Sequence, residues 1–302
     1  MKVPSVYVVI VNWNGKADTC QCLTSLQVVR KLCSSLSVIV VDNGSTDGSV
    51  GEFKSKFPWV HIIKTGENRG FAGGNNIGIS YALENKAEYI WFLNNDTVVD
   101  SGVLTSLSSF EDPSVGAVGS KIYFYKGCEF HKNRYKEKDL GSVLWYAGGT
   151  IDWQNMLASH RGVDEVDHGQ YDKETNTDFI TGCSFFVRSE ILKKIGFFDE
   201  SYFMYMEDLD ISLRIQKAGF KTMYNPASIV WHKNASSSGG SGSSLHEYYQ
   251  TRNRLRIGMK YAPLRTKIAL LREGLRILGG SSSIKKKAVL DWMKGTMGPY
   301  HE

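Results

Sequence analysis

Unbroken apolar runs recur in the first third of the chain, over residues 6–11, 38–41 and 89–93. A strand that is covered on both faces reads as such a run, whereas a strand with one face in water alternates between apolar and polar residues. The stretches between the runs have the mixed composition of helices that cover a sheet. Strand and helix in alternation predict βαβ units, and therefore an α/β fold with a mostly parallel sheet.

Weaker signals complete the expected elements. Further strands are predicted over residues 59–63, 115–119 and 179–188, and helices over residues 17–29, 49–57, 73–85, 101–110, 189–195 and 207–217. Residues 122–172 mix aromatic and charged side chains, and no element is predicted there.

The composition changes twice toward the C-terminal end. Residues 234–244 are mostly Ser and Gly, which is typical of a mobile loop or linker. The predicted organisation is a main domain over residues 1–233, this loop, and a basic helical extension over residues 245–302. The extension carries a net charge of +8, against +5 for the whole 302-residue chain, so an anionic surface is its expected partner.

Three features bear on the compartment. No apolar run approaches the ~18 residues that a membrane-spanning helix needs. The N-terminal apolar stretch contains Pro4 and lacks a small-residue cleavage pattern, which favours a buried strand over a signal peptide. The five cysteines are odd in number and lack zinc-site spacing, so we expect reduced thiols in a cytoplasmic protein.

Polar residues stand at or just after the ends of three predicted strands: Asn12, Asp42 and Asp96. Ligands of open parallel sheets bind beyond the carboxyl ends of the strands, so we expect these side chains at one edge. Asp42 suits a contact with a ribose hydroxyl or a base N–H, which we favour over a purely turn-forming role. Asp96 suits the binding of a divalent ion that bridges diphosphate oxygens. A purely structural role in an Asx turn is an alternative to which we give the same weight.

Residues 67–76 combine Arg69 with three glycines and the start of a predicted helix. Glycines permit a close approach of the backbone, and helix N-termini hold anions. The spacing matches neither the dinucleotide fingerprint nor the phosphate-binding P-loop. We predict a nucleotide contact in this segment, and a flexible turn with a helix cap is the alternative.

Glu207 and Asp208 begin a predicted helix directly after the apolar residues 203–206. Acidic residues at a helix start are favourable by themselves. Here they emerge from a covered segment, and burial beside a second negative charge raises the pKa of a carboxyl and makes it a better base. His232 follows a short apolar run. We expect it to be structural unless it faces Asp96.

In their order and spacing these motifs resemble glycosyltransferase family 2, whose inverting members have the GT-A fold. The matching stretches are residues 9–14, 40–48, 67–76, 93–96 and 203–210. The resemblance covers residues 4–232 and implies a Rossmann-like, mostly parallel central sheet flanked by helices, with a C-terminal helical extension. In that extension Tyr248, Tyr249, Arg252, Asn253 and Arg254 are similar to the tail of rhamnosyltransferase-like members.

The resemblance also implies roles for particular residues. It implies a nucleotide-sugar pocket built from Asn12, Trp13, Asn14, Asp42, Asn68, Arg69, Asn75, Asn76, Asn94 and Asn95. It implies that Asp96 and His232 bind Mg²⁺ or Mn²⁺, and that Asp208 is the catalytic base with Glu207 beside it. The chain departs from the family's Asp-x-Asp motif at its first position, which is Asn94. An amide lacks charge, so we expect a weaker metal site.

The expected function is inverting transfer of a sugar from a UDP- or dTDP-sugar to a hydroxyl of a carbohydrate or lipid-linked saccharide, in the assembly of cell-wall or cell-surface polysaccharide or glycolipid. A non-catalytic nucleotide-sugar-binding protein is the first alternative. The second is a sugar-nucleotide pyrophosphorylase, which needs a basic, glycine-rich loop after the first strand, where this chain has only Lys16. We expect no nucleic-acid partner, and a peripheral position on the inner face of the cell membrane.

The basic extension contains an apolar stripe. Its members are Leu264, Ile268, Leu271, Leu275 and Leu278, at spacings of four, three, four and three. Such spacing places them on one face of a helix, with the basic residues to the side. Two interpretations stay open: the helix lies on an anionic membrane surface, or the stripe packs on the main domain or forms a homodimer.

Overall fold

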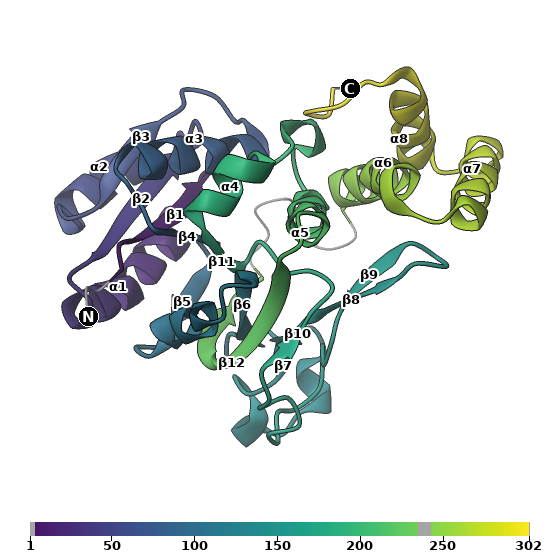
Figure 1. Ribbon diagram of the computed structural model, residues 1–302. Coiled ribbons are helices and arrows are strands. Elements are labelled where there is room, and N and C mark those ends of the chain that lie inside the picture. Colours follow the sequence, from purple (N-terminus) through teal and green to yellow (C-terminus); the bar gives the residue numbers. More distant parts are fainter. Residues whose placement is uncertain (1–3, 235–242, 302) are drawn as a thin grey trace.

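The computed structural model describes residues 4–234 and 243–301, which form a ten-stranded mixed sheet with helices on both faces (Figure 1). The strands are β1 (Val6–Asn12), β2 (Leu36–Asp42), β3 (His61–Lys64), β4 (Tyr89–Leu93), β5 (Thr97–Val99), β6 (Val115–Phe124), β7 (Leu144–Tyr146), β8 (Gly149–Asp152), β9 (Leu157–His160), β10 (Thr175–Asn176), β11 (Ser184–Arg188) and β12 (Lys221–His232). The helices are α1 (Lys16–Leu32), α2 (Ser49–Lys56), α3 (Gly70–Glu84), α4 (Ser189–Ile195), α5 (Glu207–Lys217), α6 (Ser244–Tyr261), α7 (Leu264–Gly279) and α8 (Ser283–Lys294).

The sheet has the order β10-β12-β6-β11-β4-β1-β2-β3. Strands β3, β2, β1 and β4 are parallel, as are β6 and β12, and β11 runs antiparallel between β4 and β6. The predicted mostly parallel sheet is therefore confirmed. The chain places β2 and β3 on one side of β1 and β4 on the other. Such a switch point leaves a crevice beyond the carboxyl ends of the strands, where Asn12 and Asp42 form the last pair of β1 and β2.

Alternate side chains of β1 build the two cores. Val8 and Ile10 pack in one cluster with side chains of α1 and α2, while Val9 packs in another with side chains of α3, α4 and α5. Helix α3 lies very close to β1, because a Cβ added at Gly78 would stand 2.3 Å from a methyl group of Val9. Both faces of the strand are dry, which is the physical reason for its unbroken apolar sequence.

Several elements differ in extent from the prediction. Helix α3 begins at Gly70, three residues early, because the carbonyl of Phe203 accepts the N–H of Phe71 (2.9 Å) and so caps the helix from a distant segment. The predicted helix 101–110 is a run of 3₁₀ turns over Val103–Glu111. Only Ser184–Arg188 of the predicted strand 179–188 is a strand. Within the unassigned region 122–172, β8 and β9 form a hairpin and β7 pairs with β6.

The predicted helical extension is confirmed as α6, α7 and α8 (Figure 1). The predicted Ser/Gly loop lies outside the described residues over 235–242. In the described part of the chain, none of the helices combines the length and the apolar character that crossing a membrane requires. All five cysteines are free thiols, as predicted.

Helix α6 fastens the backbone that leads into α5. The amide nitrogen Nδ2 of the buried Asn253 lies 3.0, 2.8 and 2.9 Å from the carbonyls of Tyr202, Met204 and Tyr205. Those carbonyls belong to a strained turn, because Phe203, Tyr205 and Met206 have φ angles of 63°, 67° and 72°. Non-glycine residues hold such angles only where the surroundings impose them.

Asn253→Ala should destabilise this turn. Its three carbonyl acceptors would each lose a hydrogen bond in a buried place, so we expect the free energy of unfolding to fall by about 1–3 kcal/mol. Hydrogen exchange of the amides in 203–206 should accelerate as well. Urea unfolding and exchange mass spectrometry measure the two effects.

Asn85→Ala is the matched control. Asn85 also donates to a carbonyl, that of Tyr81 (2.8 Å), but in an exposed position at the end of α3. Its loss should change the free energy of unfolding by no more than about 0.5 kcal/mol. An Asn253→Ala protein as stable as this control would show that α6 does not hold the turn.

Candidate active site

A cavity of about 610 Å³ lies beyond the carboxyl ends of the central strands. Its lining includes Val11 and Trp13 after β1, Asn43 after β2, Asn94, Asn95 and Asp96 after β4, residues 181–183 before β11, residues 204–209 at the start of α5, His232 at the end of β12, and His246 and Gln250 of α6. Elements far apart in the sequence thus meet at the edge of the sheet that the motifs predicted.

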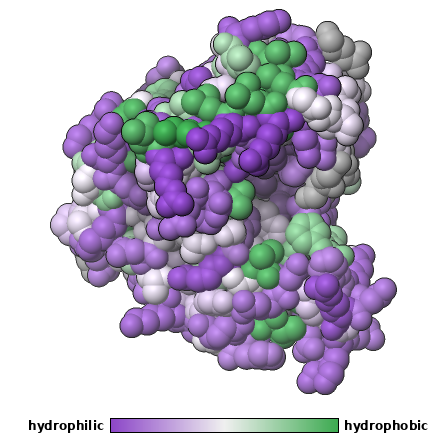
Figure 2. All heavy atoms as spheres, turned by 90° about the vertical axis from the view of Figure 1, so that its right-hand side faces the viewer, coloured by the Kyte–Doolittle hydropathy of each residue, from purple (hydrophilic) through white to green (hydrophobic). Residues whose placement is uncertain are grey.

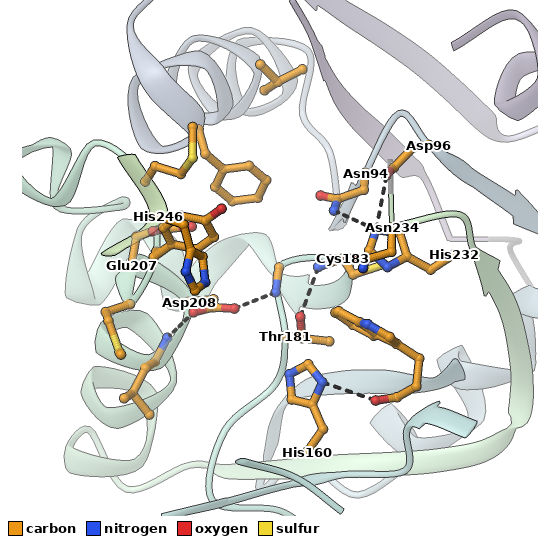
Figure 3. Close-up of a pocket in the computed structure, with 18 of the residues that line it drawn as sticks. Asn94, Asp96, His160, Thr181, Cys183, Glu207, Asp208, His232, Asn234 and His246 are labelled. Carbon is orange, nitrogen blue, oxygen red and sulfur yellow. Dashed lines mark hydrogen bonds and ion pairs between the residues drawn. The ribbon is translucent and has the colours of Figure 1, made fainter. Parts of the chain in front are cut away.

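The chemical groups of the cavity lie on two opposing walls (Figure 3). Glu207 and Asp208 stand on one wall, and Asn94, Asp96 and His232 stand on the other. Residues 181–183 connect the walls. The N–H of Gly182 donates to Oδ2 of Asp208 (2.9 Å), and the carbonyl of Cys183 accepts the N–H of Asn94 (3.0 Å).

Glu207 is buried and Asp208 beside it is half-buried, and the two differ in their partners. Burial, and after it the negative charge of Asp208, raise the pKa of Glu207 well above its usual range. Burial also raises the pKa of Asp208, while the N–H groups of Gly182 and Leu209 (2.8 Å to Oδ1) act in the opposite direction. Oε2 of Glu207 is buried without a hydrogen-bond partner among the described residues.

The proton of this pair therefore belongs on Glu207 and the charge on Asp208. Two backbone N–H groups stabilise a carboxylate, and an orphaned buried oxygen does not. The predicted rise of the pKa by burial is confirmed for both residues. Asp208 is thus an ionised group with a raised pKa inside a cavity, which is the property of a general base.

On the opposite wall, His232 faces Asp96. Nε2 of His232 lies 3.1 Å from Oδ1 of Asp96, and Nδ2 of Asn94 lies 3.4 Å from the same nitrogen. Burial is the strongest single influence and would lower the pKa of His232, but the charges and hydrogen bonds of Asp96 and Cys183 together raise that pKa well above its usual range. We expected His232 to be structural unless it faces Asp96, and the structure shows that it does face Asp96.

These two side chains fit a divalent ion as a pair of neighbouring ligands. Two donors at about 2.1 Å from an ion and at right angles stand about 3.0 Å apart, close to the separation of Asp96 and His232. Among the residues that the structure describes, no group of three or more His, Cys, Asp and Glu side chains gathers as a metal site. The remaining ligands of such an ion would therefore be water or oxygens of a bound ligand.

Asn12 and Asp42 lie behind the lining rather than in it. Nδ2 of Asn12 donates to Asp42 (3.1 Å), and Oδ1 of Asn12 accepts the hydroxyl of Thr19 (2.8 Å). Both are almost fully buried. Next to them Asn43 reaches the cavity and donates to Oδ1 of Asn68 (3.0 Å), which also lines it. Asn43 belongs to the motif of residues 40–48 but is not among the predicted site residues.

The other predicted nucleotide-contacting residues hold the surrounding loops. Oδ1 of Asn14 accepts the N–H of Thr46 (2.8 Å), and the exposed Arg69 pairs with Glu67 (3.1 Å). Nδ2 of Asn75 donates to the carbonyl of Phe71 (2.9 Å). Nδ2 of Asn76 donates to Phe198 (3.0 Å) and Glu200 (2.8 Å). Their roles toward a nucleotide stay predictions, whereas Trp13, Asn68, Asn94 and Asn95 line the cavity.

Sequence reasoning missed the floor of the cavity. The ring of Trp145 makes T-shaped contacts with the rings of His160 (4.4 Å between ring centres) and His232 (4.5 Å between ring centres). Burial lowers the pKa of His160 to about 4, so its ring is neutral at pH 7. Both Trp145 and His160 lie in the region without a readable pattern. Gly182 did carry a signal, because a glycine inside a predicted strand often marks a close backbone approach.

The geometry can be set beside known proteins. Residues 4–258 match the family described as "Glycosyltransferase like family 2". The chain is similar to the N-acetylglucosaminyl-diphospho-decaprenol L-rhamnosyltransferase of Mycobacterium tuberculosis, at 27% identity over 69% of this chain and 70% of that protein. It is also similar to the dTDP-rhamnosyl transferase RfbF of Shigella flexneri, at 27% identity over 58% of this chain and 60% of that protein.

Solved structures show the same fold. GalNAc-T7 with UDP, GalNAc and Mn²⁺ superposes with a TM-score of 0.66, at 17% identity over 97% of this chain and 55% of that chain. The mannosyltransferase PcManGT from Pyrobaculum calidifontis, in complex with GDP-Man and Mn²⁺, superposes with a TM-score of 0.58, at 16% identity over 98% of this chain and 84% of that chain. At these identities the likeness concerns the fold.

Glu207→Gln should flatten the dependence of stability on pH. Burial and the charge of Asp208 raise the pKa of Glu207 above its ordinary value of 4.5. Between the two values the folded protein holds one proton more than the unfolded chain, so stability falls as pH rises, by about 1.4 kcal/mol per pH unit. Gln does not titrate, so the variant should lose this slope and be more stable than the parent near pH 7.

Urea unfolding at a series of pH values measures the slope. Glu190→Gln is the control, since Glu190 also stands in the first turn of a helix, α4, but is exposed. That variant should keep the parent's slope. Equal slopes in the parent and in Glu207→Gln would place the proton elsewhere.

Proposed function

We propose that this chain, which belongs to the family described as glycosyltransferase like family 2, transfers a sugar from a nucleotide-sugar to an acceptor hydroxyl with inversion at the anomeric carbon. One observation carries the proposal. A half-buried carboxylate, Asp208, faces the Asp96–His232 pair across a single cavity. An acceptor beside Asp208 and a donor diphosphate beside Asp96 would then enclose the anomeric carbon between them.

In this reaction Asp208 accepts the proton of the acceptor hydroxyl. The hydroxyl oxygen forms a bond to the anomeric carbon as the bond from that carbon to the diphosphate oxygen breaks, and attack opposite to the leaving group inverts the centre. The raised pKa of Asp208 makes it a stronger base than an exposed aspartate. Glu207 stays protonated and adds no second negative charge near the developing diphosphate.

Asp96 and His232 would hold Mg²⁺ or Mn²⁺, and such an ion neutralises the charge of a diphosphate leaving group. The separation of the two side chains supports this role. Because the protein offers so few ligands, the diphosphate itself would complete the coordination. Asn94 replaces a carboxylate of the family motif, so the ion would bind with the nucleotide rather than before it.

The relatives support a dTDP- or UDP-linked deoxysugar as the donor, because two of them are rhamnosyltransferases by name. The name of the first also supports a lipid-linked saccharide as the acceptor, and we place the reaction in the assembly of cell-surface polysaccharide or glycolipid on the cytoplasmic side of a membrane. The catalytic domain would cover residues 1–233. The contacts of Asn253 with residues 202–205 support counting α6 with it.

The family assignment favours transfer over the pyrophosphorylase alternative. A panel of UDP- and dTDP-sugars, with release of nucleoside diphosphate in the presence of candidate acceptors as the readout, tests the proposal. Donor binding without release from any pair would favour the non-catalytic alternative.

Asp208→Asn should remove the base and keep the fold. We expect nucleotide binding to persist and turnover to fall by about 10²–10⁴, the usual scale for general base catalysis. Steady-state kinetics and calorimetric binding separate the two effects. Glu207→Gln is the control, since a neutral amide replaces a neutral acid, and it should retain far more turnover. Full activity in Asp208→Asn would remove Asp208 from the mechanism.

Asp96→Ala should weaken metal-dependent binding of nucleoside diphosphate. With one protein ligand lost from a sparse site, we expect affinity to fall by about tenfold or more in the presence of Mn²⁺. Little Mn²⁺ should bind to the parent without nucleotide. Calorimetry that finds tight Mn²⁺ binding to the nucleotide-free parent, unchanged in the variant, would contradict both statements. Asp112→Ala, at an exposed carboxylate outside the cavity lining, serves as the control.

A further inference from the structure

The apolar stripe of α7 faces solvent. Leu264, Ile268, Leu271 and Leu275 are 74%, 43%, 44% and 66% exposed, whereas Leu278 packs against the core. At about 100° per residue, these four exposed side chains lie within about 60° of one another on the helix. Packing of the stripe on the main domain is therefore contradicted for four of its five members.

The opposite side of α7 does the packing. Thr266, Leu270 and Gly274 are its buried residues, and Leu270 contacts α6 closely, since a Cβ added at Gly258 would stand 2.2 Å from it. The helix is thus fixed to the body of the protein by one face and presents the other outward. An outward apolar face of this kind usually marks an interaction site.

Helix α8 extends the apolar surface. Leu290 and Met293 are 42% and 59% exposed. Figure 2 shows hydrophobic residues gathered in a band across the upper part of the face that looks to the right in Figure 1, where α7 and α8 lie. Hydrophilic side chains border the band. We call the six exposed apolar residues of α7 and α8 the apolar band.

The charge around the apolar band is positive. Residues 264–294 hold eight Lys and Arg against two Asp and Glu. The two acids are engaged, because Glu273 pairs with Arg254 (2.6 Å) and Asp291 lies 3.6 Å from Lys287. Arg265, Arg272 and Arg276 stand exposed beside the stripe and make no ion pair among the described residues.

We propose that the apolar band docks the protein on an anionic lipid surface, with its side chains in the headgroup region and the flanking arginines and lysines on lipid phosphates. Long basic side chains beside a shallow apolar face suit such an interface. A second copy of the chain suits it poorly, because a symmetric dimer would bring the same positive flanks against each other. The surface does not depend on the reaction proposed for the cavity.

Co-sedimentation of the full chain with vesicles tests this surface. The chain should bind vesicles of phosphatidylcholine with phosphatidylglycerol, and should bind weakly to phosphatidylcholine alone or at high salt. Leu264→Gln combined with Leu275→Gln should lower binding by about tenfold or more. Leu32→Gln is the matched control, because Leu32 is 71% exposed on α1, and it should bind like the parent. All these side chains are exposed, so thermal melting should be unchanged.

A variant that lacks two arginines tests the electrostatic contribution to lipid binding. Arg272→Gln with Arg276→Gln should lower binding to anionic vesicles by about tenfold, whereas Lys193→Gln, an exposed site on α4, should not. Equal binding by the parent and the leucine double variant would overturn the proposal. A chain that ignores anionic vesicles at low salt would also overturn it. If light scattering then finds a dimer of the parent and a monomer of the leucine double variant, the apolar band is a dimer interface.

Discussion

Two adjacent carboxyl groups, one buried and one half-buried, stand at the start of α5, and only one of them can be charged there at a tolerable cost. Hydrogen bonds from the backbone decide which of the two carboxyl groups carries the charge. Gly182 and Leu209 direct N–H groups at Asp208, while an oxygen of Glu207 has no hydrogen-bond partner in the described part of the chain. The strained turn before α5, the fastening of that turn by Asn253 and the close passage of residue 182 all serve this one arrangement.

The same backbone links the two halves of the site. Gly182 donates to Asp208, and the carbonyl of Cys183 accepts the N–H of Asn94 on the opposite wall. A shift of this short segment would move both walls together. The spacing between Asp208 and the Asp96–His232 pair is thus set by hydrogen bonds from backbone N–H groups, which vary less with side-chain substitution than packing does. This explains how a chain with Asn94 in place of a carboxylate can keep the layout of the site.

The C-terminal helices divide two tasks between them. Helix α6 turns its polar Arg252 and Asn253 inward, where both are fully buried against the turn that carries the catalytic segment. Helix α7 turns Leu264 and Leu275 outward beside exposed arginines that make no ion pair in the part of the chain that the structure describes. This reverses the usual pattern of polar outside and apolar inside, and each reversal has a function in our account: the first positions the base, and the second docks the protein on lipid.

Local patterns in the sequence determined the parallel sheet, most of the helices and the edge where the site would form, because unbroken apolar runs and their polar ends are properties of short segments. Asp96, Glu207 and Asp208 could be singled out for the same reason, whereas His232 gained its expected role only from the family resemblance. The floor around Trp145 was not, since its chain follows no period and its role comes from contacts with distant residues. Nor could sequence alone choose between an inward and an outward stripe on α7. A helix with two usable faces is oriented by whichever face finds complementary partners, and only the folded chain supplies them.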